Sequence, residues 1–241
     1  LTATAIGGFV PAHGNSFTMI ENTTGSGTTR TFAGKPEGGS LTLGGVNAFI
    51  TYAGGTGAND VVINVDNLAP KVTSTTPAQA AVGVATNSNV TLNFSEAVNI
   101  AAGGITVDCG GVQAFAPTLP QNGVTSIVID PSNLLPAGVV CTVTVVSANV
   151  NDLAGNVLDG DGNGTGGDNF VLTFTTACTN SIVVATNADS GPGSLRQAVI
   201  DACPGSTITF DISTVVSPIS LSTGQIMLTK DVNIQGPGAN V

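Results

Sequence analysis

The chain has 241 residues, and its five Lys and Arg against fifteen Asp and Glu give a formal net charge of −10 at pH 7. A balance this acidic opposes binding to phosphate backbones and to anionic lipid surfaces, so we expect no nucleic-acid partner. Only 8% of the residues are charged, whereas Gly alone contributes 32. This composition favours strands and turns over helices, and the length suits two or three modules better than one.

No apolar run approaches the roughly twenty residues that cross a bilayer, so we expect no membrane span. The chain begins at Leu1 without a signal segment, which predicts a mature or excised piece of a longer exported precursor. The four cysteines are an even number and predict disulfides formed in an oxidising compartment. We therefore expect an extracellular or cell-surface location.

Residues 1–67 contain short candidate strands that are separated by Gly-rich corners. These strands lie at 16–20, 29–32, 40–43, 48–52 and 60–65. The phrases GNSFTMIEN, TFAGKPEGGSLTLGG and FITYAGGTGANDVVI resemble the terminal segment of β-helical bacterial surface proteins. The resemblance implies that residues 1–67 are the end segment of a β-helix or β-solenoid.

A short boundary that contains a proline, residues 67–70, precedes a segment of alternating apolar and polar residues. Its clearest candidate strands lie at 90–94, 105–109, 126–129, 141–145 and 170–174. This density of strands is typical of an antiparallel sandwich. The phrases PKVTSTTPAQAAVGVATNSNVTLNFSEAV, VNDLAGNVLDGDGNGTGGDNF and FVLTFTTA resemble the Ig-like domain of bacterial surface-layer proteins and adhesins. Residues 68–177 are therefore expected to form a bacterial Ig-like β-sandwich.

After Cys178 the sequence predicts one short amphipathic helix and then only strands. Ser194 is the expected N-cap, and Gln197 completes a capping box three residues later. The expected apolar stripe of the helix consists of Leu195, Ala198, Val199 and Ala202. The candidate strands that follow the helix lie at 207–212, 219–221, 226–228 and 232–234. The stretch TNSIVVATNADSGPGSLRQAVIDACPGSTITFDI resembles the opening of a parallel β-helix. The resemblance implies that residues 178–241 are the cap and first rungs of such a helix.

The predicted fold is thus all-β, with an Ig-like antiparallel β-sandwich between β-helical, solenoid-type terminal segments and one short capping helix. The C-terminal GPGANV reads on into the N-terminal LTATAIGG as if one rung had been cut there. We therefore expect residues 178–241 of one copy to continue into residues 1–66 of another. The continuation is covalent between neighbouring repeats, or non-covalent and head to tail. Truncation inside a long β-helix is the alternative.

The cysteines predict two disulfides. Cys109 and Cys141 both fall on the apolar, inward side of their candidate strands, which favours a bridge across the sandwich. Cys178 and Cys203 flank the predicted helix, so a bridge between them would attach the cap to the end of the sandwich. Four buried free thiols are the alternative, and the absence of a CxxC spacing disfavours zinc or redox chemistry.

The DGDGNG stretch resembles the first half of a calcium loop, with oxygen ligands at alternate positions and a glycine for the turn. The candidate Ca²⁺ ligands are Asp159, Asp161, Asn163, Asp168 and Asp152, with Asn151 as the alternative to Asp152. The Glu expected at the twelfth position is missing, because Phe170 stands there. A solvated hairpin tip is the other interpretation of this stretch.

The sequence offers few candidate catalytic residues. His13 is the only histidine, and no nucleophile lies near it in the chain. We expect Arg196 in a structural salt bridge or a carbonyl contact. We expect Glu96 in solvent at a strand end, although its carboxylate could reach a metal. The predicted function is a non-enzymatic structural module of an exported bacterial surface protein. An adhesin or carbohydrate-binding module with a cell-surface or glycan ligand is the alternative, and a piece of a β-helical polysaccharide enzyme is a third.

Overall fold

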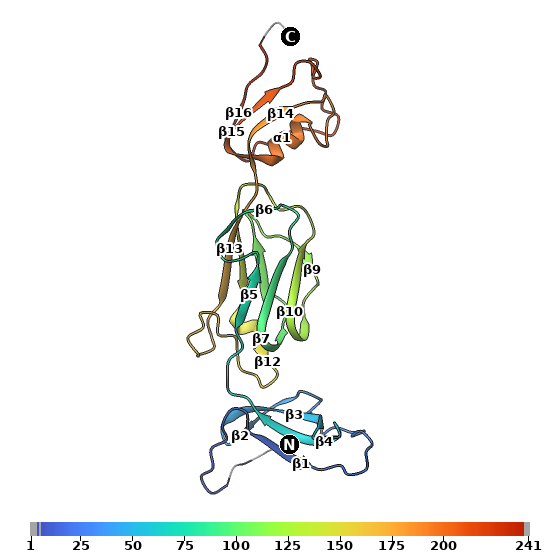
Figure 1. The fold of residues 1–241 in the computed structure, drawn as a ribbon, viewed down its shortest axis with the longest axis vertical. Coiled ribbons are helices and arrows are strands. Elements are labelled where there is room, and N and C mark those ends of the chain that lie inside the picture. The colour runs from blue at the N-terminus through green and yellow to red at the C-terminus, as the bar shows by residue number, and fades with distance from the viewer. Residues whose placement is uncertain (1–3, 5, 239–241) are drawn as a thin grey trace.

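The computed structural model describes residue 4 and residues 6–238. Three modules follow one another along the long axis of the molecule (Figure 1). We call them the N-terminal module (residues 16–65), the sandwich (residues 72–176) and the C-terminal module (residues 179–234). Strands make up nearly all of the regular structure, which confirms the predicted all-β class.

The N-terminal module is a four-stranded sheet in the order β1-β4-β3-β2. Its strands are β1 (Ser16–Ile20), β2 (Ser40–Leu43), β3 (Val46–Gly54) and β4 (Asp60–Val65). All neighbouring strands are antiparallel. Its small core consists of Leu41, Ala48, Ile50, Tyr52, Val61, Ile63 and Val65.

The antiparallel pairing shows that the predicted β-helical end is wrong for this module, because the rungs of a β-helix pair in parallel through long connections. Gly44 and Gly45 form the two-residue link between β2 and β3, and their φ angles of 61° and 87° suit a tight hairpin turn. The strand predicted at 29–32 is also wrong. Phe32 there donates its N–H to the Tyr52 hydroxyl at 2.8 Å instead of joining a ladder.

Two sheets form the sandwich. One has the order β12-β7-β10-β9 with β5 also paired to β7, and the other has the order β6-β13-β11-β8. Their strands are β5 (Val72–Thr76), β6 (Ala81–Val84), β7 (Val90–Ile100), β8 (Ile105–Asp108), β9 (Phe115–Ala116), β10 (Gln121–Pro131), β11 (Val140–Val145), β12 (Val150–Asp152) and β13 (Phe170–Thr176). A short 3₁₀ helix at Ser147–Asn149 precedes β12.

The core of the sandwich lies between these sheets. Leu92 and Ile100 of β7 and Leu172 and Phe174 of β13 are almost completely buried in it. Along β7 the buried residues alternate with polar ones at first, as a half-buried strand requires. The predicted sandwich is therefore present.

Cys109 and Cys141 form a disulfide with their Cα atoms 4.1 Å apart, which confirms the predicted pair. The prediction that it crosses the sandwich is wrong. Cys109 directly follows β8 and Cys141 lies in β11, and these strands are neighbours in one sheet. The alternation of apolar and polar residues shows only that both cysteines point into the core. It does not distinguish strands in facing sheets from neighbouring strands of one sheet.

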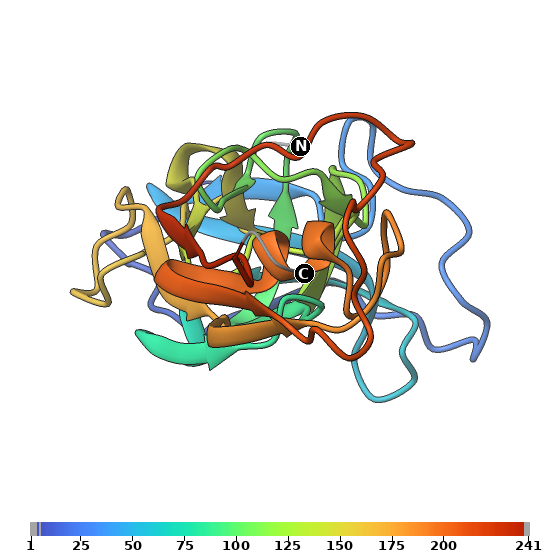
Figure 2. The same cartoon turned by 90° about the horizontal axis from the view of Figure 1, so that it is seen from above.

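The C-terminal module contains β14 (Thr179–Val184), α1 (Leu195–Asp201), β15 (Ala202–Phe210) and β16 (Val232–Ile234). The strands pair in parallel in the order β14-β15-β16, and they lie with α1 at the near end of the molecule in Figure 2. The pairing aligns Ile182 with Ile208 and Ile208 with Ile234. The strands predicted at 219–221 and 226–228 are wrong, since these residues form irregular loop.

Half of the predicted capping box is present at the start of α1. The Ser194 hydroxyl accepts the N–H of Gln197 at 3.2 Å. The Gln197 side chain does not return the bond, because it donates to Asp201 at 2.9 Å instead. The i to i+4 contact along the helix surface competes successfully with the cap.

We expect replacement of both Cys109 and Cys141 by Ala to lower the free energy of unfolding of the sandwich by about 3 to 4 kcal/mol, because the bridge closes a long loop in the unfolded chain. Urea denaturation of the double variant measures this loss. An unchanged urea midpoint would contradict a stabilising role.

Candidate functional site

The acidic loop after β12 brings three of the predicted calcium ligands together. Asp159 is only 3% exposed, and its Oδ1 accepts the N–H groups of Gly162 at 2.8 Å and Asn163 at 3.1 Å. Its Oδ2 accepts the N–H of Gly164 at 2.8 Å. Desolvation alone would raise the pKa of Asp159, but these bonds outweigh it and lower that pKa.

The other predicted ligands lie around the same loop. Asp161 accepts both the backbone N–H and the side-chain amide of Asn163, at 3.0 and 2.9 Å. The side-chain oxygen Oδ1 of Asn163 accepts the N–H of Thr165 at 2.7 Å. Asp168 is exposed. The loop uses most of these oxygens to satisfy its own N–H groups, and calcium binding here stays a prediction.

Asp152 has a different position and role. It is 1% exposed, and its Oδ1 accepts the N–H groups of Gly155 at 2.7 Å and Asn156 at 2.8 Å. Its Oδ2 accepts the Asn156 side-chain amide at 2.7 Å. Asn151, the alternative, donates its side-chain amide to the Asp152 carbonyl. Asp152 therefore caps its own loop, residues 152–157, and does not complete the Asp159 loop as predicted.

This loop forms the joint between the sandwich and the N-terminal module. The Asn156 side chain donates to the Asp66 carbonyl at 2.9 Å and accepts the side-chain amide of Asn47, a β3 residue, at 2.7 Å. A Cβ atom at Gly38 would lie 3.8 Å from the Leu153 side chain, so the two modules also lie close together there. One asparagine thus bonds two parts of the N-terminal module at once.

Three carboxylates meet beside this joint. Asp66 follows β4, Glu96 lies in β7 and Asp152 ends β12, and one oxygen of each lies within 4.8 Å of the others. Desolvation, then the charge and hydrogen bond of Asp66 and the charge of Asp152, raise the pKa of Glu96 to about 8. Desolvation also raises the pKa of Asp152, against the opposing hydrogen bonds of its loop. We call Asp66, Glu96 and Asp152 the carboxylate trio.

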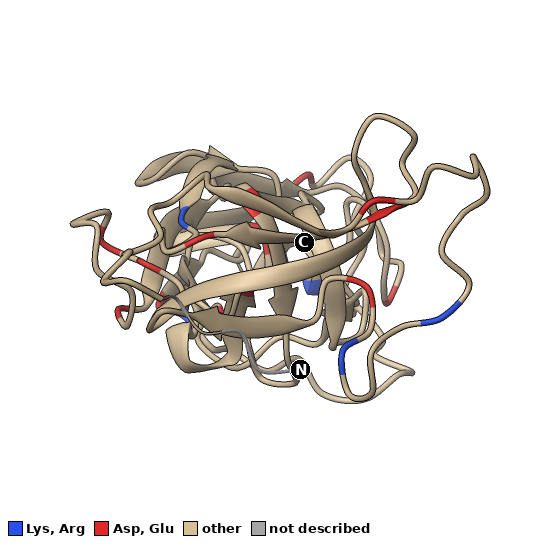
Figure 3. Ribbon diagram, turned by 90° about the horizontal axis from the view of Figure 1, so that it is seen from below, with Lys and Arg blue, Asp and Glu red and all other residues tan. Residues whose placement is uncertain are grey.

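Sequence reasoning missed the carboxylate trio. Glu96 was expected in solvent, whereas the structure partly buries it. Its partners lie 30 residues before it and 56 residues after it in the chain, so no local spacing could reveal the cluster. The only available signal was the general acidic excess of residues 66–176, which contain eight Asp and Glu and one basic residue, Lys71. Figure 3 shows how few basic segments the ribbon carries.

A second polar cluster holds the C-terminal module together. Arg196 pairs with the Asp189 carboxylate at 2.7 Å, as the expected structural salt bridge, and also donates to the carbonyls of Gly224 and Gln225. The other Asp189 oxygen accepts the backbone N–H and hydroxyl groups of both Ser222 and Thr223. Arg196 and these hydroxyl and amide donors hold the pKa of Asp189 well below its usual range. The cluster fixes an irregular loop onto α1.

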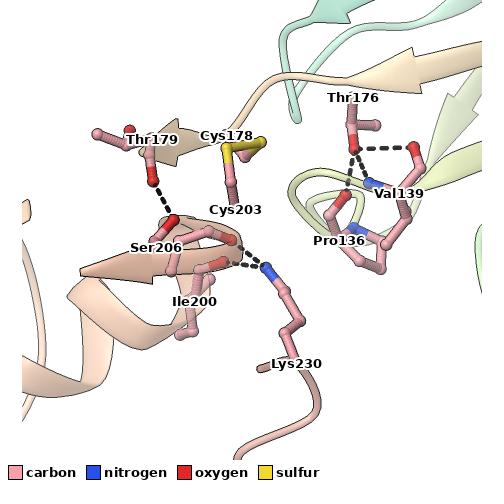
Figure 4. Close-up of a disulfide and its surroundings, with 10 residues drawn as sticks. Pro136, Val139, Thr176, Cys178, Thr179, Ile200, Cys203, Ser206 and Lys230 are labelled. Atoms are coloured by element: carbon pink, nitrogen blue, oxygen red, sulfur yellow. Dashed lines mark hydrogen bonds between the residues drawn. A yellow bond between two sulfur atoms is a disulfide. The ribbon is translucent and has the colours of Figure 1, made fainter. Parts of the chain in front are cut away.

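Cys178 and Cys203 form the second predicted disulfide, with a Cα separation of 4.9 Å. Cys178 lies in the two-residue link between β13 and β14, and Cys203 lies in β15 (Figure 4). At the end of the sandwich, the Thr176 hydroxyl donates to the Pro136 carbonyl at 2.6 Å and accepts the N–H of Val139 at 3.0 Å. The disulfide therefore lies at the joint between the sandwich and the C-terminal module, as predicted.

We expect Asp159→Ala to lower the thermal midpoint of the sandwich by more than Asp161→Ala does, because only the buried Asp159 satisfies three backbone N–H groups. The difference in thermal midpoint between the two variants should have its full size above pH 3.8, the ordinary Asp pKa. It should shrink as the pH falls through the lowered pKa of Asp159. Thermal unfolding of both variants from neutral to acidic pH measures it. Equal midpoints at neutral pH would contradict the assignment.

Three comparisons with known proteins bear on identity. Residues 66–176 match the sequence profile of a family described as a bacterial Ig-like domain. No curated protein sequence matches the chain.

The part of the chain that the structure describes has no helix that is both long enough and apolar enough to cross a membrane.

Similar solved structures include two of a bacterial S-layer protein. One is the N-terminal part of SbsC, with 13% identity, a TM-score of 0.31, and coverage of 49% of this chain and 28% of that chain. The other is rSbsC(31-844), with 14% identity, a TM-score of 0.31, and coverage of 52% and 16%. The chain therefore spans less than a third of either protein, and scores this low carry no argument. The family match and the two-sheet fold together identify residues 66–176 as similar to the bacterial Ig-like domain.

Proposed function

We propose that this chain is a non-enzymatic structural module of an exported bacterial surface protein, in which the Ig-like sandwich holds two other β modules in line. The observation that carries the proposal is the end-to-end arrangement of the three modules (Figure 1). The N-terminal and C-terminal modules lie at opposite ends of the sandwich. A pulling force applied to one outer module is thus transmitted through the sandwich to the other.

The joint between the sandwich and the C-terminal module supports a stiff connection. Only Ala177 and Cys178 separate β13 from β14, and the Ala177 N–H donates to the Val84 carbonyl at 2.6 Å. The Cys178–Cys203 disulfide then ties the link to β15. The link has only two residues, one held by a backbone hydrogen bond and the other by a disulfide, so the C-terminal module has little freedom to bend relative to the sandwich.

The C-terminal module supports the second part of the proposal, which is that a parallel β-solenoid begins here. Each strand is offset from the next by the same number of residues, because Ile182 aligns with Ile208 and Ile208 with Ile234. Equal offsets in a parallel ladder are typical of stacked rungs. An open cavity of about 390 Å³ with Phe210, Val215, Ile219 and Ile234 among its lining residues lies beside the β16 edge, where a further rung would pack.

Head-to-tail association of copies is the third part of the proposal, in a form changed by the antiparallel N-terminal sheet. That sheet cannot continue a parallel coil, so a second copy would add an edge strand to β16 instead. Negative-stain electron microscopy of the purified chain tests this. Filaments with an axial repeat of one chain would support it, and dispersed particles at high concentration would contradict it.

The linear arrangement has its own test. We expect small-angle X-ray scattering to give an elongated particle whose longest dimension matches three modules in a row. A compact or strongly flexible particle would contradict the proposed spacer. Saturable binding on a glycan array would instead favour the adhesin alternative.

The rigidity of the C-terminal joint can be tested at Gly138. This residue has a φ of 69°, and a Cβ atom there would lie 2.9 Å from the Cys178 sulfur and 3.2 Å from Pro204. We expect Gly138→Ala to loosen the joint and to lower the thermal midpoint of the chain. Gly123→Ala is the matched control, because Gly123 has a similar φ of 65° but no atom within 4 Å of the new Cβ. Both variants carry the backbone strain, about 1 kcal/mol, but only Gly138→Ala adds the clash. Equal effects in scattering and unfolding would contradict a tight joint.

A further inference from the structure

The joint between the N-terminal module and the sandwich differs in kind from the joint at the other end. Its described hydrogen bonds come from side-chain amides: Asn156 bonds Asp66 and Asn47 across the joint, where the Leu153 side chain also lies near Gly38. On the N-terminal side, the Asp66 N–H donates to the Asn47 carbonyl at 3.0 Å. No disulfide crosses it among the described residues. The closed geometry of this joint therefore depends on electrostatics and on a few hydrogen bonds.

The carboxylate trio lies at this joint with one member from the N-terminal side and two from the sandwich. Asp66 belongs to the link after β4, whereas Glu96 and Asp152 belong to the neighbouring strands β7 and β12. In the structure, where the joint is closed, one oxygen of Asp66 lies within 4.8 Å of an oxygen of each of the other two carboxylates. If all three are ionised, closure places like charges together in a partly desolvated site, which is unfavourable.

The other charged groups around Glu96 give limited compensation. His13 Nδ1 lies 3.0 Å from Asp66 Oδ1, and its side chain is 46% exposed. Lys71 precedes β5, which pairs with β7, but it is exposed to solvent. On β10, the other neighbour of β7, the residues paired near Glu96 are Val124 and Ser126, which carry no charge. Asp152 is already engaged by its loop.

We propose that this joint is a proton-controlled hinge, which is closed while Glu96 is protonated and loosens when the whole carboxylate trio is ionised. Protonated Glu96 removes one of the three charges and can donate a hydrogen bond to Asp66. The hinge works within one chain, so it stands whether or not the chain forms a solenoid or a filament.

The direction of the effect follows from proton linkage. The pKa of Glu96 is raised from 4.5 to about 8 in the closed structure, so the closed form binds this proton more tightly than the open form does. Glu96 therefore stabilises closure fully below pH 4.5, and this contribution is lost as the pH rises toward about 8. Acid closes the joint, and alkali opens it.

The test is ¹⁵N NMR relaxation of the full chain from about pH 5 to pH 9, with a chelator present so that cations do not neutralise the carboxylates. Closed modules tumble together, whereas an open hinge gives the N-terminal module a shorter correlation time. The side-chain amide signals of Asn47 and Asn156 report the joint directly. We expect the wild type to change from joint to separate tumbling as the pH rises, and Glu96→Gln to tumble as one body throughout.

Asp130→Asn is the matched control, because it removes one carboxylate from an exposed position on β10 outside the joint. We expect this variant to keep the pH dependence of the wild type. The hinge would be overturned by a wild type whose tumbling does not depend on pH. It would equally be overturned by a pH response that persists in Glu96→Gln or disappears in Asp130→Asn.

Discussion

The apolar core between the two sheets of the sandwich, to which β7 and β13 both contribute, is the interaction on which the rest of the molecule depends. Leu92 and Ile100 from one strand and Leu172 and Phe174 from the other are buried in the core between the two sheets. The same two strands serve the two joints. β7 carries Glu96 and pairs with β12, which leads into the loop at the N-terminal joint, while β13 runs directly into Cys178 at the other end. A loss of core packing would therefore disturb both joints together.

The two joints use different physical means. The C-terminal joint is short and covalent, with a two-residue link and a disulfide. The N-terminal joint is longer and polar, and its geometry depends on one asparagine and three carboxylates. Covalent geometry does not respond to solution conditions short of reduction, whereas a cluster of acidic groups responds to protons. A single chain thus combines one fixed connection with one that can respond to its surroundings.

Local patterns in the sequence were sufficient for much of the fold. Alternation predicted the core strands of the sandwich, and residue type predicted the N-cap at Ser194. Strand parity favoured the Cys109–Cys141 pair, whereas the Cys178–Cys203 pair was predicted because these two cysteines flank the helix. Topology was harder, because strands in a β-helix and in an antiparallel sheet have the same alternation, and Gly44 with Gly45 was the one local sign of a hairpin. The carboxylate trio could not be predicted at all, since its members become neighbours only after three strands and a loop have assembled. In the DGDGNG stretch, the spacing that predicts a metal is also the spacing with which the buried Asp159 accepts three backbone N–H groups of its own loop, and calcium binding there stays a prediction.

The Cys178–Cys203 bridge has a mechanical consequence for tension applied along the long axis of the molecule. The cysteines are separated by 25 positions in the chain, and β14 and α1 lie within that interval. Tension from the C-terminal end reaches Cys203 and passes through the sulfur atoms to Cys178, so the enclosed segment lies outside the loaded path. Stretching cannot draw out this segment while the bridge is intact, and the C-terminal module has less chain length to release than its number of residues suggests.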